Sequence, residues 1–172
     1  MLVEAAIKPI LAVIGHRTLW EHSQEAAAVA QRFATSSGLI SPSDAYLLGL
    51  VHDVGALLLA LAPADAHASV RSLTASGCET PVAELLIFGT THAQAGADVL
   101  RHWGMPEDYV NAVEHHHDPE VGGSTGAALL YLTEQWTEPN GDRLRDDRLE
   151  YSMAELNLNE VLPYKWGHAL RH

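Results

Sequence analysis

Hydrophobic residues recur every three or four positions along most of the chain, which is the spacing of one face of an α-helix. Helices are predicted over residues 2–14, 18–36, 45–62, 63–76, 81–88, 90–103, 107–117, 124–137 and 152–166. The sequence contains no convincing strand-like alternation, no glycine-rich phosphate loop and no internal repeat. We therefore expect an all-α fold, formed as a single domain over residues 1–172.

Capping and helix-breaking residues mark the ends of these segments. Ser41 and Pro42 supply a start for the segment 45–62 and Pro63 supplies its stop, while Gly77 permits a left-handed cap. Pro106 is well placed as the first residue of its helix. The stretch 138–150 is rich in Arg and Asp, and is predicted to be an exposed loop or a solvated helix.

The segment 45–62 contains one imidazole and one charged group, the neighbours His52 and Asp53. Its 18 mostly apolar residues approach the length of a membrane span, but an Asp and a His near the middle of a bilayer would be costly. A soluble core helix is the better interpretation. Burying this imidazole and this carboxylate costs free energy unless a partner compensates them, and a metal ion bound by both suits them best. The alternative is a buried His–Asp pair joined by a hydrogen bond, without a metal.

Composition and charge narrow the possible functions. Hydrophobic residues make up 47% and charged residues 19%, as in an ordinary globular protein. The net charge of -12 argues against a broad contact with nucleic acid or an anionic membrane. The single cysteine, Cys78, excludes an internal disulfide and a thiolate zinc cluster. Because the N-terminus lacks a signal-peptide pattern, we expect a cytoplasmic protein.

Further histidines lie on or beside the predicted apolar faces. His22 falls on the stripe of the segment 18–36, and His92 falls in the first turn of the helix that follows the threonine cap at 90–91. Taken alone, His22 is typical of a hydrogen-bonded core residue, and His92 is typical of an ordinary residue at the start of a helix. The run His115-His116-His117 can be a solvated helix end. Since successive helical residues diverge by about 100°, at most two of the three can face one point.

Taken together, these residues form a stronger signal than any one of them. The candidate ligands lie on five predicted helices: His22, His52, Asp53, His92, His116, His117 and Glu134. Imidazole with carboxylate suits iron, manganese or zinc, and the lack of thiolates disfavours structural zinc. We expect one or two metal ions, iron or manganese rather than zinc, with Asp53 able to bridge two.

Four motifs carry a family resemblance. They are Leu-Trp-Glu-His22-Ser, Gly-Leu-Val-His52-Asp53-Val-Gly, Thr-His92-Ala-Gln-Ala-Gly-Ala and Val-Glu-His-His116-His117-Asp-Pro. Over about residues 19–136 the chain resembles the HD superfamily of metal-dependent phosphohydrolases, and more narrowly its HDOD branch, the HD-related output domains. The resemblance implies an HD-like helical bundle around a one- or two-metal site, and a role in bacterial signal transduction and gene regulation. Residues 138–172 would form a C-terminal helical extension.

The chain also departs from the family patterns. Ala56 stands where active relatives usually have a lysine that can contact phosphate, and Glu134 stands where the last ligand is usually aspartate. The Gly-Tyr-Pro motif of the more distantly related HD-GYP phosphodiesterases does not follow Pro119. Only residues 1–17 precede the first motif, so the chain is either a short member or a piece of a longer one.

These observations leave different functions open. The favoured one is a regulatory or scaffolding module that keeps the metal pocket as a structural or sensing element and acts through a protein partner. The alternative is a phosphohydrolase acting on a phosphorylated small molecule or nucleotide, with His52 and Asp53 as the central catalytic pair. Di-iron oxygenase chemistry is a third possibility that no residue selects. The missing lysine and the acidic chain weaken the hydrolase interpretation.

Overall fold

The structure is a computed structural model, and it describes residues 17–137 and 147–158. Every regular element in these two ranges is a helix: α2 Arg17–Ser37, α3 Pro42–Val51, α4 Ala56–Leu59, α5 Ala64–Ala75, α6 Thr80–Phe88, α7 His92–His102, α8 Glu107–Glu114, α9 Pro119–Gly122, α10 Thr125–Thr137 and α11 Asp147–Glu155. The all-α prediction is therefore confirmed. The helix predicted over residues 2–14 lies outside the described residues, as do 138–146 and 159–172.

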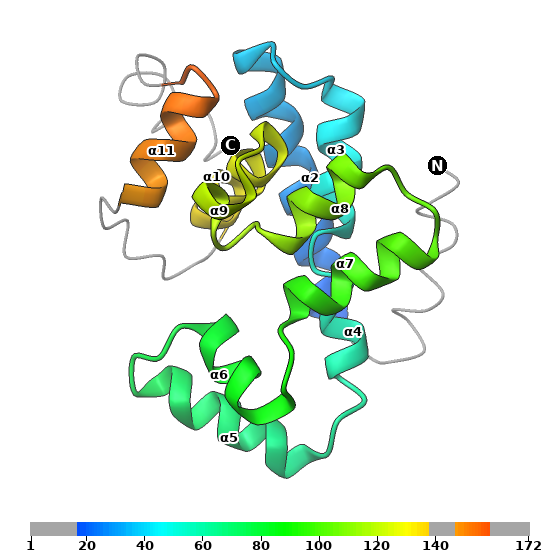
Figure 1. The fold of residues 1–172 in the computed structure, drawn as a ribbon, viewed down its shortest axis with the longest axis vertical. Coiled ribbons are helices and arrows are strands. Elements are labelled where there is room, and N and C mark those ends of the chain that lie inside the picture. Colours follow the sequence, from blue (N-terminus) through cyan, green and yellow to red (C-terminus); the bar gives the residue numbers. More distant parts are fainter. Residues whose placement is uncertain (1–16, 138–146, 159–172) are drawn as a thin grey trace.

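Helices α2 and α3 lie side by side and begin the bundle (Figure 1). Their backbones approach closely at Gly49, where an added Cβ would lie 2.7 Å from the carbonyl oxygen of Ala26. Ser41 caps α3 by accepting a hydrogen bond from the backbone N–H of Asp44, as the Ser-Pro start predicts. The close crossing places the end of α3, and with it His52, beside α2.

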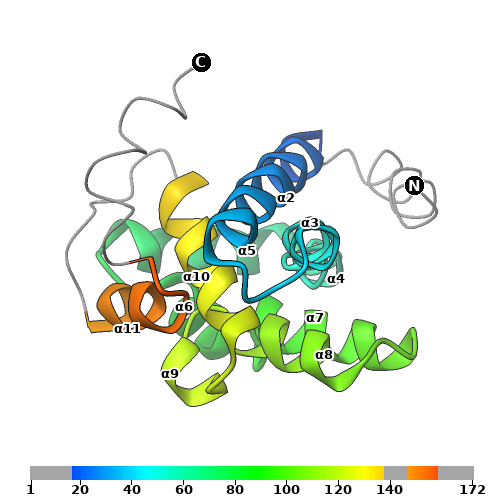
Figure 2. The same ribbon diagram turned by 90° about the horizontal axis from the view of Figure 1, so that it is seen from above.

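Helix α10 runs through the middle of the bundle and packs on α2, α3, α8 and α11 (Figure 2). Two hydrophobic clusters meet along it. One includes Leu50, Leu100 and Leu130, and the other includes Phe33 and Leu129. Because α10 is buried along much of its length, it is a rigid support for Glu134 near its end.

Helices α5 and α6 pack on each other and extend from one end of the bundle (Figure 1). No residue of α5 is buried, whereas α6 buries Ala83 and Glu84. Helix α6 ends at Gly89, whose φ of 77° is a left-handed cap that glycine adopts without strain. The chain then enters α7, where Thr91 and Gln94 form a capping box.

The single helix predicted over residues 45–62 is wrong. Helix α3 ends at Val51, and the bonds from Val54 N to Val51 O and from Ala56 N to Asp53 O, at 3.0 and 2.9 Å, form a tight turn before α4. A Cβ on Gly55 would lie only 2.0 Å from the carbonyl oxygen of His92. Contact with α7 therefore accompanies the break, and the break turns Asp53 toward the bundle interior.

Other boundaries also differ from the predictions. The helix predicted to begin at 152 begins at Asp147 and ends at Glu155, and residues 159–166 of that prediction lie outside the described residues. Helix α8 ends at Glu114, so the three histidines that follow lie in a turn rather than in the last helical turn. Pro106 caps this helix from outside instead of being its first residue. None of the described helices combines the length and the apolar character that crossing a membrane requires.

Candidate metal centre

All seven predicted ligands come together between the helices. Their side chains form two groups, within each of which one ligand atom per residue lies within 4.8 Å of the others. The first group is His22, His52, Asp53 and Glu134, and the second is His92, His116 and His117. The predicted convergence of these residues is thus present, although their binding of a metal stays a prediction.

Asp53 belongs to the first group and also faces the second. Its Oδ2 is 3.5 Å from the Nε2 atoms of His22 and His52, while its Oδ1 is 3.5 Å from His92 Nε2 and 4.0 Å from His116 Nε2. Oδ1 is buried and accepts no hydrogen bond from the described residues. A buried carboxylate oxygen without a donor is costly, and a cation at this point would compensate it.

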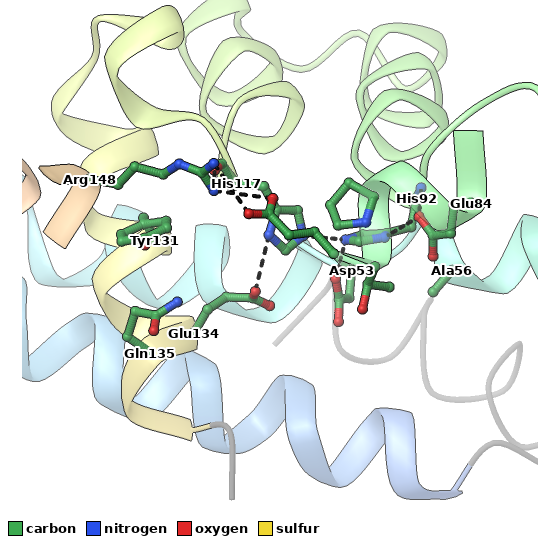
Figure 3. Close-up of a pocket in the computed structure, with 12 residues that line it drawn as sticks. Asp53, Ala56, Glu84, His92, His117, Tyr131, Glu134, Gln135 and Arg148 are labelled. Carbon is green, nitrogen blue, oxygen red and sulfur yellow. Dashed lines mark hydrogen bonds and ion pairs between the residues drawn. The ribbon is translucent and has the colours of Figure 1, made fainter. Parts of the chain in front are cut away.

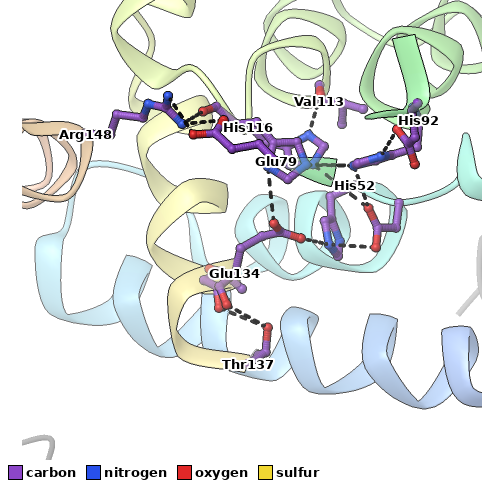
Figure 4. A network of polar contacts seen from close by, with 12 residues as sticks. His52, Glu79, His92, Val113, His116, Glu134, Thr137 and Arg148 are labelled. Atoms are coloured by element: carbon purple, nitrogen blue, oxygen red, sulfur yellow. Dashed lines mark hydrogen bonds and ion pairs between the residues drawn. The ribbon is translucent and has the colours of Figure 1, made fainter. Parts of the chain in front are cut away.

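Glu134 also connects the groups, from the opposite side. Its Oε1 is 3.2 Å from His52 Nε2 (Figure 4), and its Oε2 is 3.5 Å from His117 Nδ1 (Figure 3). A glutamate in place of the usual aspartate would have to fold back if it bound at the same point. Here its two oxygens instead reach one histidine from each group, so the extra methylene is used to span the site.

Three histidine rings are held in one orientation, each by a hydrogen bond from its Nδ1 atom to a different acceptor. His52 Nδ1 donates to the carbonyl oxygen of Gly49 at 2.8 Å, and His116 Nδ1 donates to that of Val113 at 2.6 Å. His92 Nδ1 donates to Glu84 Oε2 at 2.7 Å. This is how metal-binding histidines are oriented in proteins, because the proton on Nδ1 leaves Nε2 to face the ion.

The Nε2 atoms of the second group crowd each other. His92 Nε2 lies 3.3 Å from His116 Nε2 (Figure 4) and 2.8 Å from His117 Nε2. Because a carbonyl oxygen can only accept, His116 Nε2 carries a lone pair. Nitrogen atoms this close repel one another unless a proton or a metal cation lies between them. The donor set and its arrangement therefore fit a transition metal.

Burial and neighbouring charges shift the pKa values of these groups in opposite directions. Burial disfavours the charged form of His52, but the carboxylates of Asp53 and Glu134 outweigh burial and raise its pKa to about 9. For Asp53, burial is outweighed by the imidazoles of His52 and His92, and its pKa is lowered. Burial and the neighbouring His117 lower the pKa of His116 well below its usual value. Without a metal, the carboxylate of Asp53 is therefore anionic and His116 is neutral, whereas His52 is protonated; despite burial, Glu84 and Asp53 also raise the pKa of His92.

The sequence reasoning missed Glu84. Its side chain is buried, and one oxygen accepts from both the backbone N–H and the Nδ1–H of His92, at 2.8 and 2.7 Å. A signal was present, since Glu84 is the only charged residue in the apolar segment 80–88. Of the three consecutive histidines, His116 and His117 belong to the second group and His115 to neither. The number agrees with the prediction of at most two, but the helical argument behind that prediction does not apply, because the three residues lie in a turn.

A pocket of about 450 Å³ opens onto the site (Figure 3). Asp53, His92, His117 and Glu134 line its inner part. Its wall includes Ala56, where the family resemblance leads one to expect a lysine, and Arg148 of α11. Arg148 was also missed, because it lies in a stretch so rich in charge that no position stands out. Ligand-sized space thus lies directly against the candidate metal ligands.

This arrangement, a helical bundle with a His–Asp turn facing further histidines, is that of an HD-type domain. The family model described as HDOD domain matches residues 2–119, so the chain belongs to the HDOD family.

One curated protein and one solved HDOD structure are similar to this chain at more than 25% identity. An uncharacterized protein of Treponema pallidum (strain Nichols) is 26% identical over 106 residues, which are 59% of this chain and 20% of that protein. The crystal structure of an HDOD domain protein with unknown function from Geobacter sulfurreducens matches at a TM-score of 0.62 and 27% identity, over 69% of this chain and 41% of that one.

Two further structures share the fold. A putative phosphohydrolase from Shewanella amazonensis SB2B has a TM-score of 0.67 at 22% identity, over 87% of this chain and 59% of that one. The MmoQ response regulator from Methylococcus capsulatus has a TM-score of 0.58 at 22% identity, over 84% of this chain and 57% of that one. This chain spans a fifth of the curated relative's length and between 41% and 59% of the solved chains.

Proposed function

We propose that this HDOD domain is a metal-binding regulatory module of bacterial signal transduction. The observation that carries the proposal is the set of three histidines whose Nδ1 atoms are held by Gly49, Glu84 and Val113, so that their Nε2 atoms meet around Asp53. One ion would be held by the group of His22, and a second by the group of His92, with Asp53 between them. Iron or manganese suits this mixed set better than zinc.

A structural or sensing role for the ion follows from where its ligands originate. They come from α2, the turn after α3, the start of α7, the turn after α8 and from α10. Two ions bound there, one in each group, would together tie five segments to one another, so their binding or loss would change the stability of the whole bundle. A cytoplasmic protein partner would detect that change. Position 56 is an alanine, whereas active relatives usually have a lysine there that can contact phosphate. This difference supports a regulatory module that does not catalyse a reaction.

A second candidate, a phosphohydrolase, is favoured by the pocket. A buried structural ion needs no access, yet a space of about 450 Å³ reaches Asp53 and His92. When bound, the metal would supply a water of lowered pKa and neutralise charge on a phosphoester. His52, held by Gly49 and Glu134, would keep Asp53 in position, and the neutral His116 and His117 would complete the ligand set.

Metal content and turnover of the purified chain distinguish the candidates. Iron, manganese and zinc are measured in the wild type, in Asp53→Ala and in His102→Ala, whose exposed side chain makes it a control outside the site. Each protein is then tested against a generic phosphodiester and a panel of nucleotides. Metal without turnover supports the module, and turnover that only Asp53→Ala abolishes supports the hydrolase. A folded protein that binds no metal overturns both.

A further inference from the structure

Arg148 brings a permanent positive charge to a pocket that is otherwise acidic. Of the residues described as lining the pocket, it is the only Arg or Lys, whereas Asp53, Glu79, Glu84 and Glu134 are acidic. It belongs to α11, beyond the region 2–119 that the family model matches. Figure 3 shows its side chain reaching from α11 toward His117, above Tyr131.

The guanidinium group is held only loosely. Its nearest acceptors are His117 O at 3.3 Å and the two carboxylate oxygens of Glu79 at 3.4 Å, and Asp118 Oδ1 lies 3.6 Å away. Charge-assisted hydrogen bonds are typically about 2.7–2.9 Å long. The side chains of Arg148 and Glu79 are 35% and 60% exposed, so water screens the pair and the pair adds little stability.

Metal binding would change the charge that a ligand meets in this pocket. The inner carboxylates of Asp53, Glu84 and Glu134 repel anions, but two divalent cations would outweigh them. An anion would then be attracted from the inside by the metal and from the rim by Arg148. A guanidinium offers two parallel N–H donors, which match two oxygens of a phosphoryl group.

We propose that Arg148 binds and orients a phosphoryl group in this pocket, and so supplies from α11 the cation that Ala56 cannot supply. Glu79 competes with the ligand for the guanidinium. The proposal rests on the metal site of the proposed function, but it assigns a separate residue and a separate ligand. Arg148 is a positioning residue that acts whether or not the ligand is turned over.

Binding of inorganic phosphate tests the proposal by isothermal titration, with the full chain both loaded with Mn²⁺ and freed of metal. In the loaded protein, Arg148→Gln should weaken phosphate binding about tenfold or more. The matched control is Arg101→Gln, because Arg101 forms exposed ion pairs with Asp98 and Glu114 on α7 and α8. This control should leave the affinity unchanged.

Glu79 gives a result of the opposite sign. Glu79→Gln should strengthen phosphate binding about two- to fivefold, because the guanidinium is released. The double variant Glu79→Gln with Arg148→Gln should bind phosphate as weakly as Arg148→Gln alone. If the double variant binds phosphate more tightly than Arg148→Gln alone, Glu79 repels phosphate by its charge. The proposal that Glu79 competes with phosphate for the guanidinium is then overturned.

The other outcomes separate this proposal from the metal site. Equal phosphate affinity in Arg148→Gln and Arg101→Gln, or no phosphate binding at all, overturns the anion site even if metal binds. If the chain does not take up Mn²⁺ but still binds phosphate in a way that depends on Arg148, the anion site is supported and the metal site alone is overturned. Acetate is titrated in parallel, and equal affinity for acetate and phosphate overturns the assignment of a phosphoryl ligand.

Discussion

Glu84 and His92 are joined twice through one carboxylate oxygen, which accepts from the backbone N–H of His92 at 2.8 Å and from its Nδ1–H at 2.7 Å. The contact fixes the start of α7 against α6 and sets the tautomer of the imidazole. Because both bonds go to one buried oxygen, the orientation of His92 Nε2 toward Asp53 depends on this residue. Glu84 is therefore the clearest supporting residue of the candidate metal centre.

Replacement of Glu84 should weaken metal binding more than it weakens the fold. Loss of such an outer partner typically costs about 10- to 100-fold in metal affinity, and we expect Glu84→Gln to fall in this range. The affinity is measured by competition with a chelating dye, and folding by circular dichroism. Glu120→Gln, at an exposed position of α9, is the control. Unchanged metal affinity in Glu84→Gln would show that His92 needs no such partner.

The turn that carries Asp53 depends on a close backbone contact. A Cβ on Gly55 would lie 2.0 Å from His92 O and 2.3 Å from Gly96 N, and neither backbone atom can move freely. We expect Gly55→Ala to lower the free energy of unfolding by about 3 kcal/mol, and to weaken metal binding by separating Asp53 from His92.

Gly96→Ala is the matched control for this change, because it lies at the same interface. Its Cβ would meet the Val113 side chain at 3.1 Å, and a side chain can shift. We expect a loss of about 1 kcal/mol or less. Urea denaturation measures both variants, and equal losses would mean that the backbone contact at Gly55 is not specific.

Local sequence signals account for most of the helices and for the seven candidate metal ligands, but not for Glu84 or Arg148. The periodic faces predicted α2, α7 and α10, and lone polar groups in apolar segments pointed to His52 and Asp53. The same rule applied to the segment 80–88 would have identified Glu84, so that omission was avoidable.

Two features had no local signal. The break after Val51 lies in a continuous apolar run, and it is accompanied by a contact between Gly55 and His92, which are far apart in sequence. Arg148 reaches the pocket only because α11 packs on α9 and α10. Both features depend on long-range packing, which a periodicity argument does not contain.

The metal-free protein should lose stability as the pH rises from 6.5 to 9. The pKa of His52 is raised from 6.5 to about 9 in the folded state, so its charged form stabilises the fold below pH 6.5 and this contribution is lost as the pH approaches 9. A shift of that size corresponds to about 3 kcal/mol. His116 and His117, whose pKa values are lowered, affect stability only below pH 6.5.

Chemical denaturation of chelator-treated protein at several pH values measures this loss. The variant His52→Gln should show a flatter dependence over the same range, because it lacks the titrating group. His67→Gln, on α5 and away from the site, should keep the dependence of the wild type. If the free energy of unfolding of the wild type does not change between pH 6.5 and 9, Asp53 and Glu134 do not stabilise the charged form of His52.

Metal should stabilise the fold through Asp53. Its two oxygens face histidines from both groups, so an ion held there would tie α2, α3, α7 and the turn after α8 together. A ligand present at about 100 times its dissociation constant stabilises the folded state by about 2.7 kcal/mol. Mn²⁺ added to metal-free protein should therefore raise the melting temperature by several degrees. In Asp53→Asn, which keeps the shape but loses the charge, the rise should disappear, whereas Asp65→Asn on α5 should retain it. A rise of equal size in all three proteins would place the metal elsewhere.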